Sequence, residues 1–245
     1  MCTVSFLPLE NNDFILTSNR DETPLRKTIA PDFYTENNAA LLYPKDAFAG
    51  GTWIGISNQK RVICLLNGAF EKHQQKEFYR KSRGIIVTEL LAVEDAVSEI
   101  QQTNFIDIEP FTLVLIDFKN ELKIFELVWD GQNKHFQQLE HTPKIWSSAT
   151  LYNEDMKLER QAWFADWLSE NKTFQQQEII NFQTSTNKGT PETSLKMKRN
   201  FVETVSVTSV KKEKDICLIY NDILKEKFLR KRLCFNTIQN KERVL

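Results

Sequence analysis

The amino-acid sequence predicts an α+β fold in which two sheets pack together within one domain, residues 1–245. Short β-branched and aromatic runs flank the helical segments in the middle of the chain, an order typical of α+β proteins. No internal repeat and no Pro/Ser-rich linker divides the chain. A chain of 245 residues can also bury a substantial core without disulfides or structural metals.

The first third of the sequence predicts strands. Residues 3–7 and 14–18 are short and apolar, and they form a hairpin around the turn at 8–13. Residues 19–27 are polar, contain Pro24, and read as a loop. Residues 53–57 and 61–66 predict a second strand pair.

The middle of the sequence alternates between helical and strand patterns. Residues 82–101 have a helical apolar periodicity, and residues 111–117 and 121–129 predict a hairpin followed by an Asp130-Gly131 turn. A short strand at 145–149 precedes a helix at 154–168. The apolar stripe of that helix is expected at Leu158, Ala162, Trp163, Trp167 and Leu168.

The last part of the sequence returns to strands. Residues 173–182 are compatible with a further helix, and the Thr-, Ser- and Gly-rich segment 184–194 is an exposed loop. Residues 202–210 and 216–220 are strands around a charged turn. The basic run at 225–232 is interpreted as a solvated face or a charged edge strand in preference to a nucleic-acid site.

Composition and charge exclude several classes of protein. Lys plus Arg number 32 against 33 Asp plus Glu, so a net charge of -1 gives no long-range attraction to nucleic acid or to acidic membranes. No apolar stretch approaches the roughly 20 residues of a membrane-spanning helix. No signal sequence opens the chain, and we expect a cytoplasmic location.

The four cysteines, Cys2, Cys64, Cys217 and Cys234, lack CxxC and zinc-type spacing. We expect free thiols, no metal and no cofactor. Cys64, Cys217 and Cys234 lie in apolar runs and are expected to be buried and inert.

Cys2 is the first candidate for chemistry. Removal of Met1 would expose the α-amine of Cys2, whose unperturbed pKa is about 7.7–8.0, beside a thiol with a pKa of about 8.5. One residue would then supply a nucleophile and a base, as in N-terminal nucleophile enzymes. The competing interpretation is a chance cysteine at position two.

Three further motifs contain polar or glycine residues suited to a site. Asn19-Arg20-Asp21-Glu22 could return toward the first strand, where a cation would lower the pKa of the thiol and a carboxylate would orient the amine. Gly50-Gly51-Thr52-Trp53-Ile54-Gly55 permits close backbone approach. Asn67-Gly68 offers an amide for an oxyanion hole. Each motif also has a purely structural interpretation, as a polar turn, a tight turn with a core tryptophan, and a plain Asn-Gly turn.

In their order along the chain, Met1-Cys2-Thr3, the Ser18-to-Glu22 motif and the Gly50-to-Ser57 motif resemble the NRDE family, also called the transport and Golgi organisation protein 2 family. That family resembles the N-terminal nucleophile hydrolases, near bile-salt hydrolase and penicillin acylase. The resemblance implies a four-layer αββα sandwich with two antiparallel sheets.

The resemblance also implies roles for individual residues. Cys2 would be nucleophile and base, Asp21 would contact its amine, and Asn67 would be an oxyanion donor; Arg20 completes the catalytic candidates. The remaining motif residues, Asn19, Glu22, Gly51 and Trp53, are candidates for substrate binding.

Three positions depart from the pattern of the relatives. Ser18 stands in place of an Arg, Ser148 in place of a second oxyanion Asn, and Phe201 in place of a late Arg, with Lys198 and Arg199 nearby. Each change removes a group that would stabilise developing charge, and one lost oxyanion donor lowers a rate by about 10²–10³.

Two functional hypotheses and a structural alternative follow. The first is an amidohydrolase or acyltransferase acting on a small amide or acyl thioester through Cys2. The second is a non-catalytic protein that binds a small ligand in the same cleft; family resemblance adds lipid, acyl-CoA or haem handling and secretory-pathway organisation, although no CxxCH motif occurs. The alternative is a scaffold without either activity.

Overall fold

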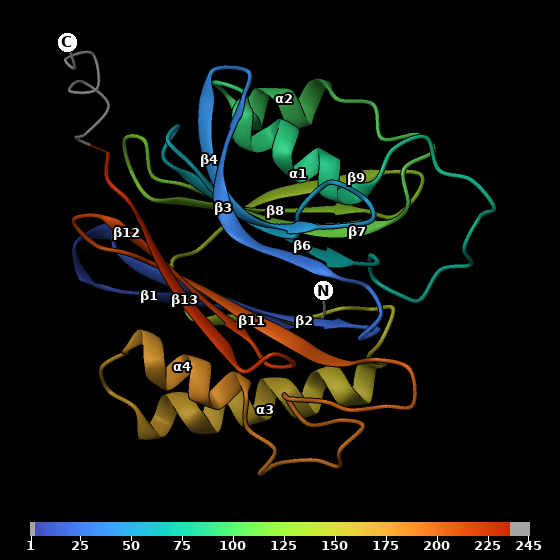
Figure 1. Ribbon diagram of the computed structural model, residues 1–245, viewed down its shortest axis with the longest axis vertical. Helices are drawn as coiled ribbons and strands as arrows, with labels where there is room; N and C mark the ends of the chain where they lie inside the picture. Colours follow the sequence, from blue (N-terminus) through green and yellow to red (C-terminus); the bar gives the residue numbers. More distant parts are fainter. Residues whose placement is uncertain (1–2, 236–245) are drawn as a thin grey trace.

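A computed structural model describes residues 3–235, so Cys2 lies outside the described residues. The elements stack in four layers (Figure 1): helices α1 and α2, a seven-stranded sheet, a six-stranded sheet, and helices α3 and α4. This αββα arrangement confirms the fold class that the sequence and the family resemblance predict.

The six-stranded sheet contains both the first and the last strands of the described chain. Its order is β10 (Lys144–Ser147), β1 (Thr3–Pro8), β2 (Phe14–Glu22), β11 (Glu203–Lys212), β12 (Ile216–Asp222) and β13 (Lys227–Leu233). All neighbours are antiparallel. The basic run thus forms the edge strand β13, whose charged side chains blunt an exposed row of backbone groups.

The seven-stranded sheet follows the chain order. It runs β3 (Thr28–Glu36), β4 (Ala39–Asp46), β5 (Ile54–Ser57), β6 (Arg61–Asn67), β7 (Phe111–Asp117), β8 (Lys123–Trp129) and β9 (Lys134–Leu139). β3, β4 and β9 were not predicted. Nearly every residue of β9 is at least partly exposed, so it lacks the apolar alternation that marks a strand in a sequence.

The core between the two sheets is formed by apolar side chains that alternate along the strands. Phe14 and Leu16 of β2 pack there against Val62 of β6, whereas Ile15 faces the opposite side and packs with Phe164 of α3. Successive residues of β2 therefore point to different layers. The same alternation determines which residues of the motif Asn19-Arg20-Asp21-Glu22, at the end of β2, can reach one site.

The predicted helix over residues 82–101 is two helices, α1 (Arg83–Ala92) and α2 (Ala96–Gln102). The Asp95 side chain accepts hydrogen bonds from two backbone N–H groups and begins α2 as its N-cap. Fully buried Arg61 of β6 donates to the carbonyls of Leu90, Val93 and Glu94 at the end of α1. These bonds satisfy carbonyls that the interruption leaves without helical partners.

Helices α3 (Glu154–Glu170) and α4 (Gln176–Gln183) cover the outer face of the six-stranded sheet. The predicted stripe of α3 is wrong in part, because Leu158 and Ala162 are exposed. Arg160 and Phe164 instead form the buried positions. Because Arg160 is charged, a search for apolar periodicity does not identify the buried face of α3.

The described thiols also differ from expectation. Cys64 is buried, as predicted, but Cys217 and Cys234 are only half-buried. Burial raises the pKa of the Cys64 thiol to about 12, although the hydroxyl of Ser18 favours the thiolate.

Candidate functional site

The candidate site lies at the end of the sandwich where β1 begins. Thr3 of β1 pairs with Asn19 of β2 on one side and with Ser147 of β10 on the other. Cys2, the predicted nucleophile, is the residue before Thr3 in the sequence. The candidate site therefore comprises the side chains around the start of β1.

The motif from Asn19 to Glu22 is the last part of β2, so the prediction of a loop over residues 19–27 is wrong at its beginning. Pairing with β11 extends the strand, with a bulge between Thr204 and Ser206. Asn19 and Asp21 share the face of Ile15, toward α3 and α4, and Arg20 shares the face of Leu16. Because these residues lie in a strand, Asn19 and Asp21 point to one face and Arg20 points to the other. A turn could have brought all three side chains to one site.

Asp21 is buried and held by two hydroxyl donors. The Tyr152 hydroxyl donates to Oδ2 of Asp21 over 2.8 Å, and the Thr204 hydroxyl donates to Oδ1 over 2.6 Å. Tyr152 precedes α3 and Thr204 belongs to β11, so two distant segments fix one carboxylate. Hydrogen bonds of this kind stabilise the charged form and hold its orientation.

Asn19 is also buried but has a different role. Its Nδ2 donates to the carbonyls of Gln183 and Leu195, 2.9 Å away in both cases. These bonds attach β2 to the end of α4 and to the segment after it. The side chain is thereby engaged away from the cavity described below.

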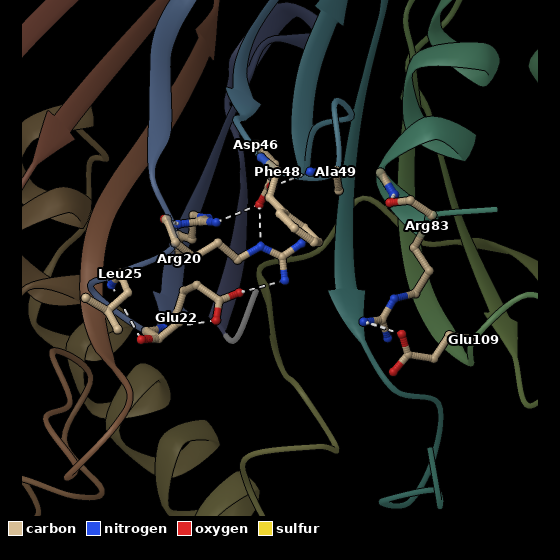
Figure 2. Close-up of polar contacts among 12 residues, drawn as sticks. Arg20, Glu22, Leu25, Asp46, Phe48, Ala49, Arg83 and Glu109 are labelled. Carbon is tan, nitrogen blue, oxygen red and sulfur yellow. Dashed lines mark hydrogen bonds and ion pairs between the residues drawn. The ribbon is translucent and has the colours of Figure 1, made fainter. Parts of the chain in front are cut away.

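Arg20 belongs to a compact group of charges on the other face (Figure 2). Its guanidinium donates to Oδ2 of Asp46 over 2.8 Å, and Arg26 Nε donates to the same oxygen over 2.8 Å. The Arg20 guanidinium lies 4.6 Å from the ring centroid of Trp53. Arg26 also pairs with Glu22 over 3.5 Å. Arg20 is therefore a neutralised cation locked in place by its neighbours.

Asp46 is the anchor of that group. Burial by itself would raise the pKa of its carboxyl, but the backbone N–H of Ala49 and the guanidiniums of Arg26 and Arg20 outweigh burial and lower the pKa. The carboxyl also accepts from the N–H of Phe48 over 3.0 Å. Asp46 thus ties the end of β4 to β2, a contact that the sequence analysis did not foresee.

A small cavity of about 80 Å³ lies beside this group. Arg20, Glu22, Trp53 and Asn67 border it, together with the N-terminus of α1. The predicted site residues Arg20, Glu22, Gly51, Trp53 and Asn67 all line it. Asn19 and Asp21 are not among its lining residues.

Gly51 makes the closest backbone approach at this cavity. A Cβ atom on Gly51 would lie 2.3 Å from the carbonyl carbon of Gly84. The N–H of Thr52 donates to the Gly84 carbonyl over 3.1 Å, which joins the start of β5 to the first turn of α1. Only a residue without a side chain fits at this position, so Gly51 lines the cavity with backbone atoms alone.

Asn67 ends β6 at the same cavity. Its backbone carbonyl accepts a hydrogen bond from the Ser148 hydroxyl over 2.7 Å. This bond connects the end of the seven-stranded sheet to the end of β10. Among residues 3–235, no hydrogen bond engages the Asn67 side-chain amide, so its N–H groups remain available as donors.

Arg83, the first residue of α1, forms a second ion pair across the cavity (Figure 2). It lies 2.9 Å from Glu109 and donates to the Pro110 carbonyl over 3.0 Å. Burial lowers the pKa of the Arg83 guanidinium, and Glu109 opposes that effect. Arg20, Arg26 and Arg83 thus bring three guanidiniums to the cavity, each paired with a carboxylate.

Sequence reasoning missed two residues at this end of the sandwich, Tyr152 and Arg160, whereas Arg199 was noted as a cation near Phe201. The Arg199 guanidinium lies 5.4 Å from the ring centroid of Tyr152, and its Nη1 donates to the Leu151 carbonyl. Arg199 thus lies beside the tyrosine whose hydroxyl donates to Asp21, while Phe201 is 82% exposed and contributes no cation. A single arginine in an exposed loop or a polar helix carries no sequence signal of this placement.

Within residues 3–235, no group of three or more metal-ligating side chains is arranged to hold a metal ion. No described helix is long and apolar enough to cross a membrane. What the described site offers chemically is a fixed carboxylate, an amide donor and paired guanidiniums around the start of β1.

The family model described as Transport and Golgi organisation 2 matches residues 1–223. The Transport and Golgi organization protein 2 homolog of Homo sapiens is 31% identical over 113 residues, which cover 42% of this chain and 40% of that protein. The homolog of Bos taurus is 35% identical over 92 residues, covering 34% and 32% respectively. The chain thus spans about two fifths or less of the length of the curated relatives it matches.

The solved structures that match include a bile acid hydrolase and an acid amidase ortholog. A variant of conjugated bile acid hydrolase from Clostridium perfringens has a TM-score of 0.57 at 10% identity, over 94% of this chain and 92% of that chain. A Caenorhabditis elegans N-acylethanolamine-hydrolyzing acid amidase ortholog has a TM-score of 0.58 at 14% identity, over 85% and 92%. At these identities the likeness concerns the fold, and it confirms the predicted resemblance.

Proposed function

Because the chain belongs to the Transport and Golgi organisation 2 family and shares the fold of N-terminal nucleophile hydrolases, we propose that it is a cysteine-type amidohydrolase or acyltransferase. Its substrate would be a small amide or an acyl thioester. Cys2 is the nucleophile after removal of Met1. The observation that carries the proposal is the buried Asp21 carboxylate, fixed by Tyr152 and Thr204 near the start of β1.

The reaction begins with the thiol of Cys2. The thiol proton passes to the α-amine, and the sulfur attacks the substrate carbonyl carbon to form a tetrahedral intermediate. The carbonyl π electrons move onto oxygen, and the Asn67 amide donates a hydrogen bond to that oxyanion. Collapse expels the leaving amine or thiolate, which takes the proton from the α-ammonium, and leaves an S-acyl cysteine.

The second half of the reaction releases the acyl group. Water, or a second nucleophile in acyl transfer, gives its proton to the α-amine as it attacks the thioester. Collapse of this second tetrahedral intermediate breaks the C–S bond, releases the acyl product and expels the Cys2 thiolate, which takes the proton back from the α-ammonium. Asp21 supports both halves because a fixed carboxylate beside the ammonium stabilises the charge that the amine gains.

The test uses an acyl thioester probe and intact-mass spectrometry on the full chain. We expect loss of Met1, followed by a mass increase of one acyl group that Cys2→Ser abolishes or leaves as a slow ester. Asp21→Asn should slow acylation by at least about tenfold. Asp222→Asn is the matched control, since Asp222 is also a buried aspartate of the same sheet and should leave acylation unchanged.

Two outcomes would overturn the proposal. Retention of Met1 would remove the α-amine that the mechanism requires. Acylation confined to other cysteines, or binding of the probe without any adduct, would favour a ligand-binding protein that uses the same cavity.

A further inference from the structure

One buried cation of the described chain has no carboxylate partner. Arg160 of α3 is 0% exposed, and among residues 3–235 no Asp or Glu forms an ion pair with it. Its Nη2 donates to the carbonyls of Thr193, over 3.0 Å, and Ser194, over 2.6 Å. Its Nη1 donates to the hydroxyl of Thr3.

Burial of a guanidinium is costly unless other charges or dipoles replace water around it. At Arg160 part of that replacement is the face of Tyr152, whose ring centroid lies 3.6 Å from the guanidinium carbon. The hydroxyl of the same tyrosine donates to Asp21 over 2.8 Å. A tyrosine ring therefore connects the buried cation to the buried carboxylate.

The contact with Thr3 has a separate consequence. Thr3 is fully buried and is the residue that follows Cys2 in the chain. A hydrogen bond from Arg160 to its side chain limits the rotation and translation of the first described residue of β1. One guanidinium thus contacts the residue attached to the proposed nucleophile and the ring that holds the proposed amine-binding carboxylate.

We propose that Arg160 is a positioning residue for the N-terminal nucleophile. It fixes Thr3 directly and Asp21 through Tyr152, so that the amine and thiol of Cys2 are presented in one geometry. This role rests on the proposed function. The competing role is a clamp on the segment at 193–194 through its two carbonyls, which would matter for stability alone.

The test measures the iodoacetamide alkylation rate of Cys2 by peptide mass spectrometry, with the thermal stability of each variant measured in parallel. Thr3→Val removes the hydroxyl at nearly constant shape, and Thr3→Ser retains it. We expect Thr3→Val and Tyr152→Phe to slow alkylation by about tenfold or more, while Thr3→Ser stays within about twofold of the wild-type rate. Intact mass confirms that Met1 is removed in each variant.

The matched control is Phe164→Leu. Phe164 is buried on the same helix one turn further on, in the apolar cluster with Ile15 and Leu195. This variant should lower stability without changing the alkylation rate. A purely structural role for Arg160 predicts instead that the rates of all variants follow their stability.

The results separate the two proposals. If wild-type Cys2 is no more reactive than Cys217, the proposed function fails and the positioning role fails with it. If wild-type Cys2 is reactive and Thr3→Val reacts at the wild-type rate, only the role of Arg160 is overturned. Arg160→Lys gives a further comparison, since lysine keeps the charge but cannot donate to Thr3 and the two carbonyls with the same planar geometry.

Discussion

Replacing Gly51 with alanine tests the contact that joins the start of β5 to α1. The added Cβ would lie 2.3 Å from the carbonyl carbon of Gly84 and 2.6 Å from its oxygen. Ordinary contacts of a Cβ atom begin at 3.4 Å, so the two backbones must separate by about 1 Å. That movement also breaks the 3.1 Å hydrogen bond from Thr52 to the Gly84 carbonyl.

The expected cost of Gly51→Ala is at least about 3 kcal/mol. Overpacking a tight site costs about 1–3 kcal/mol, with the upper end expected against rigid backbone, and a lost hydrogen bond adds about 1 kcal/mol. For a chain of this length each kcal/mol lowers Tm by about 2–4 °C, so Tm should fall by roughly 6–12 °C. Thermal unfolding and urea denaturation of the full chain measure both quantities.

Gly50→Ala is the matched control. Gly50 has φ of +74°, but no atom lies within 4 Å of an added Cβ. Its cost is backbone strain alone, about 1 kcal/mol. The reasoning is refuted if Gly51→Ala is no more destabilising than Gly50→Ala, because the clash with α1 would then be absent.

Three further predictions concern charge and burial. Because the native pKa of Asp46 is lowered, its contribution to stability is present above the unfolded-state pKa of about 3.9 and is lost as pH falls through the native value. The stability difference between wild type and Asp46→Asn, from urea denaturation at several pH values, should therefore shrink below about pH 4; a constant difference would contradict this account. Limiting iodoacetamide at pH 8 should label half-buried Cys217 before Cys64, whose thiol pKa is about 12, and peptide mass spectrometry reports the order. Arg61→Met should lower the free energy of unfolding by about 2–4 kcal/mol in urea denaturation, because it leaves three carbonyls at the end of α1 without their donor. A decrease below about 1 kcal/mol would show that water takes the place of the guanidinium.

Local sequence patterns were sufficient to predict the strands whose residues are mainly apolar and buried. β1, β6, β7 and β12 were all predicted near their observed positions, since apolar residues dominate them and turn residues bound them. The same patterns failed to predict strand structure where buried polar residues continue a strand. The end of β2 carries Asn19 and Asp21 inside the protein, where their partners come from α4, β11 and the segment before α3. No local pattern shows such partners.

The candidate site was likewise predictable in its residues but not in their arrangement. The order of the three N-terminal motifs indicated the family and the fold, and these motifs together with Asn67 supplied five residues that line one cavity. It did not show that Arg20 and Asp21 point to opposite faces of β2, nor that Asp46 neutralises Arg20.

By itself, then, the sequence determined the fold class, the family and the presence of Cys2 beside a strand, because these depend on composition, periodicity and motif order. Only the tertiary structure decided what surrounds the start of that strand. Arg160 contacts Thr3 from 157 residues away in the chain, and Tyr152 contacts Asp21 from 131 residues away. The geometry of both contacts depends on how α3 packs against the six-stranded sheet. Contacts between residues so distant in the chain leave no periodic trace in the sequence, since packing of the sheets and helices alone brings them together.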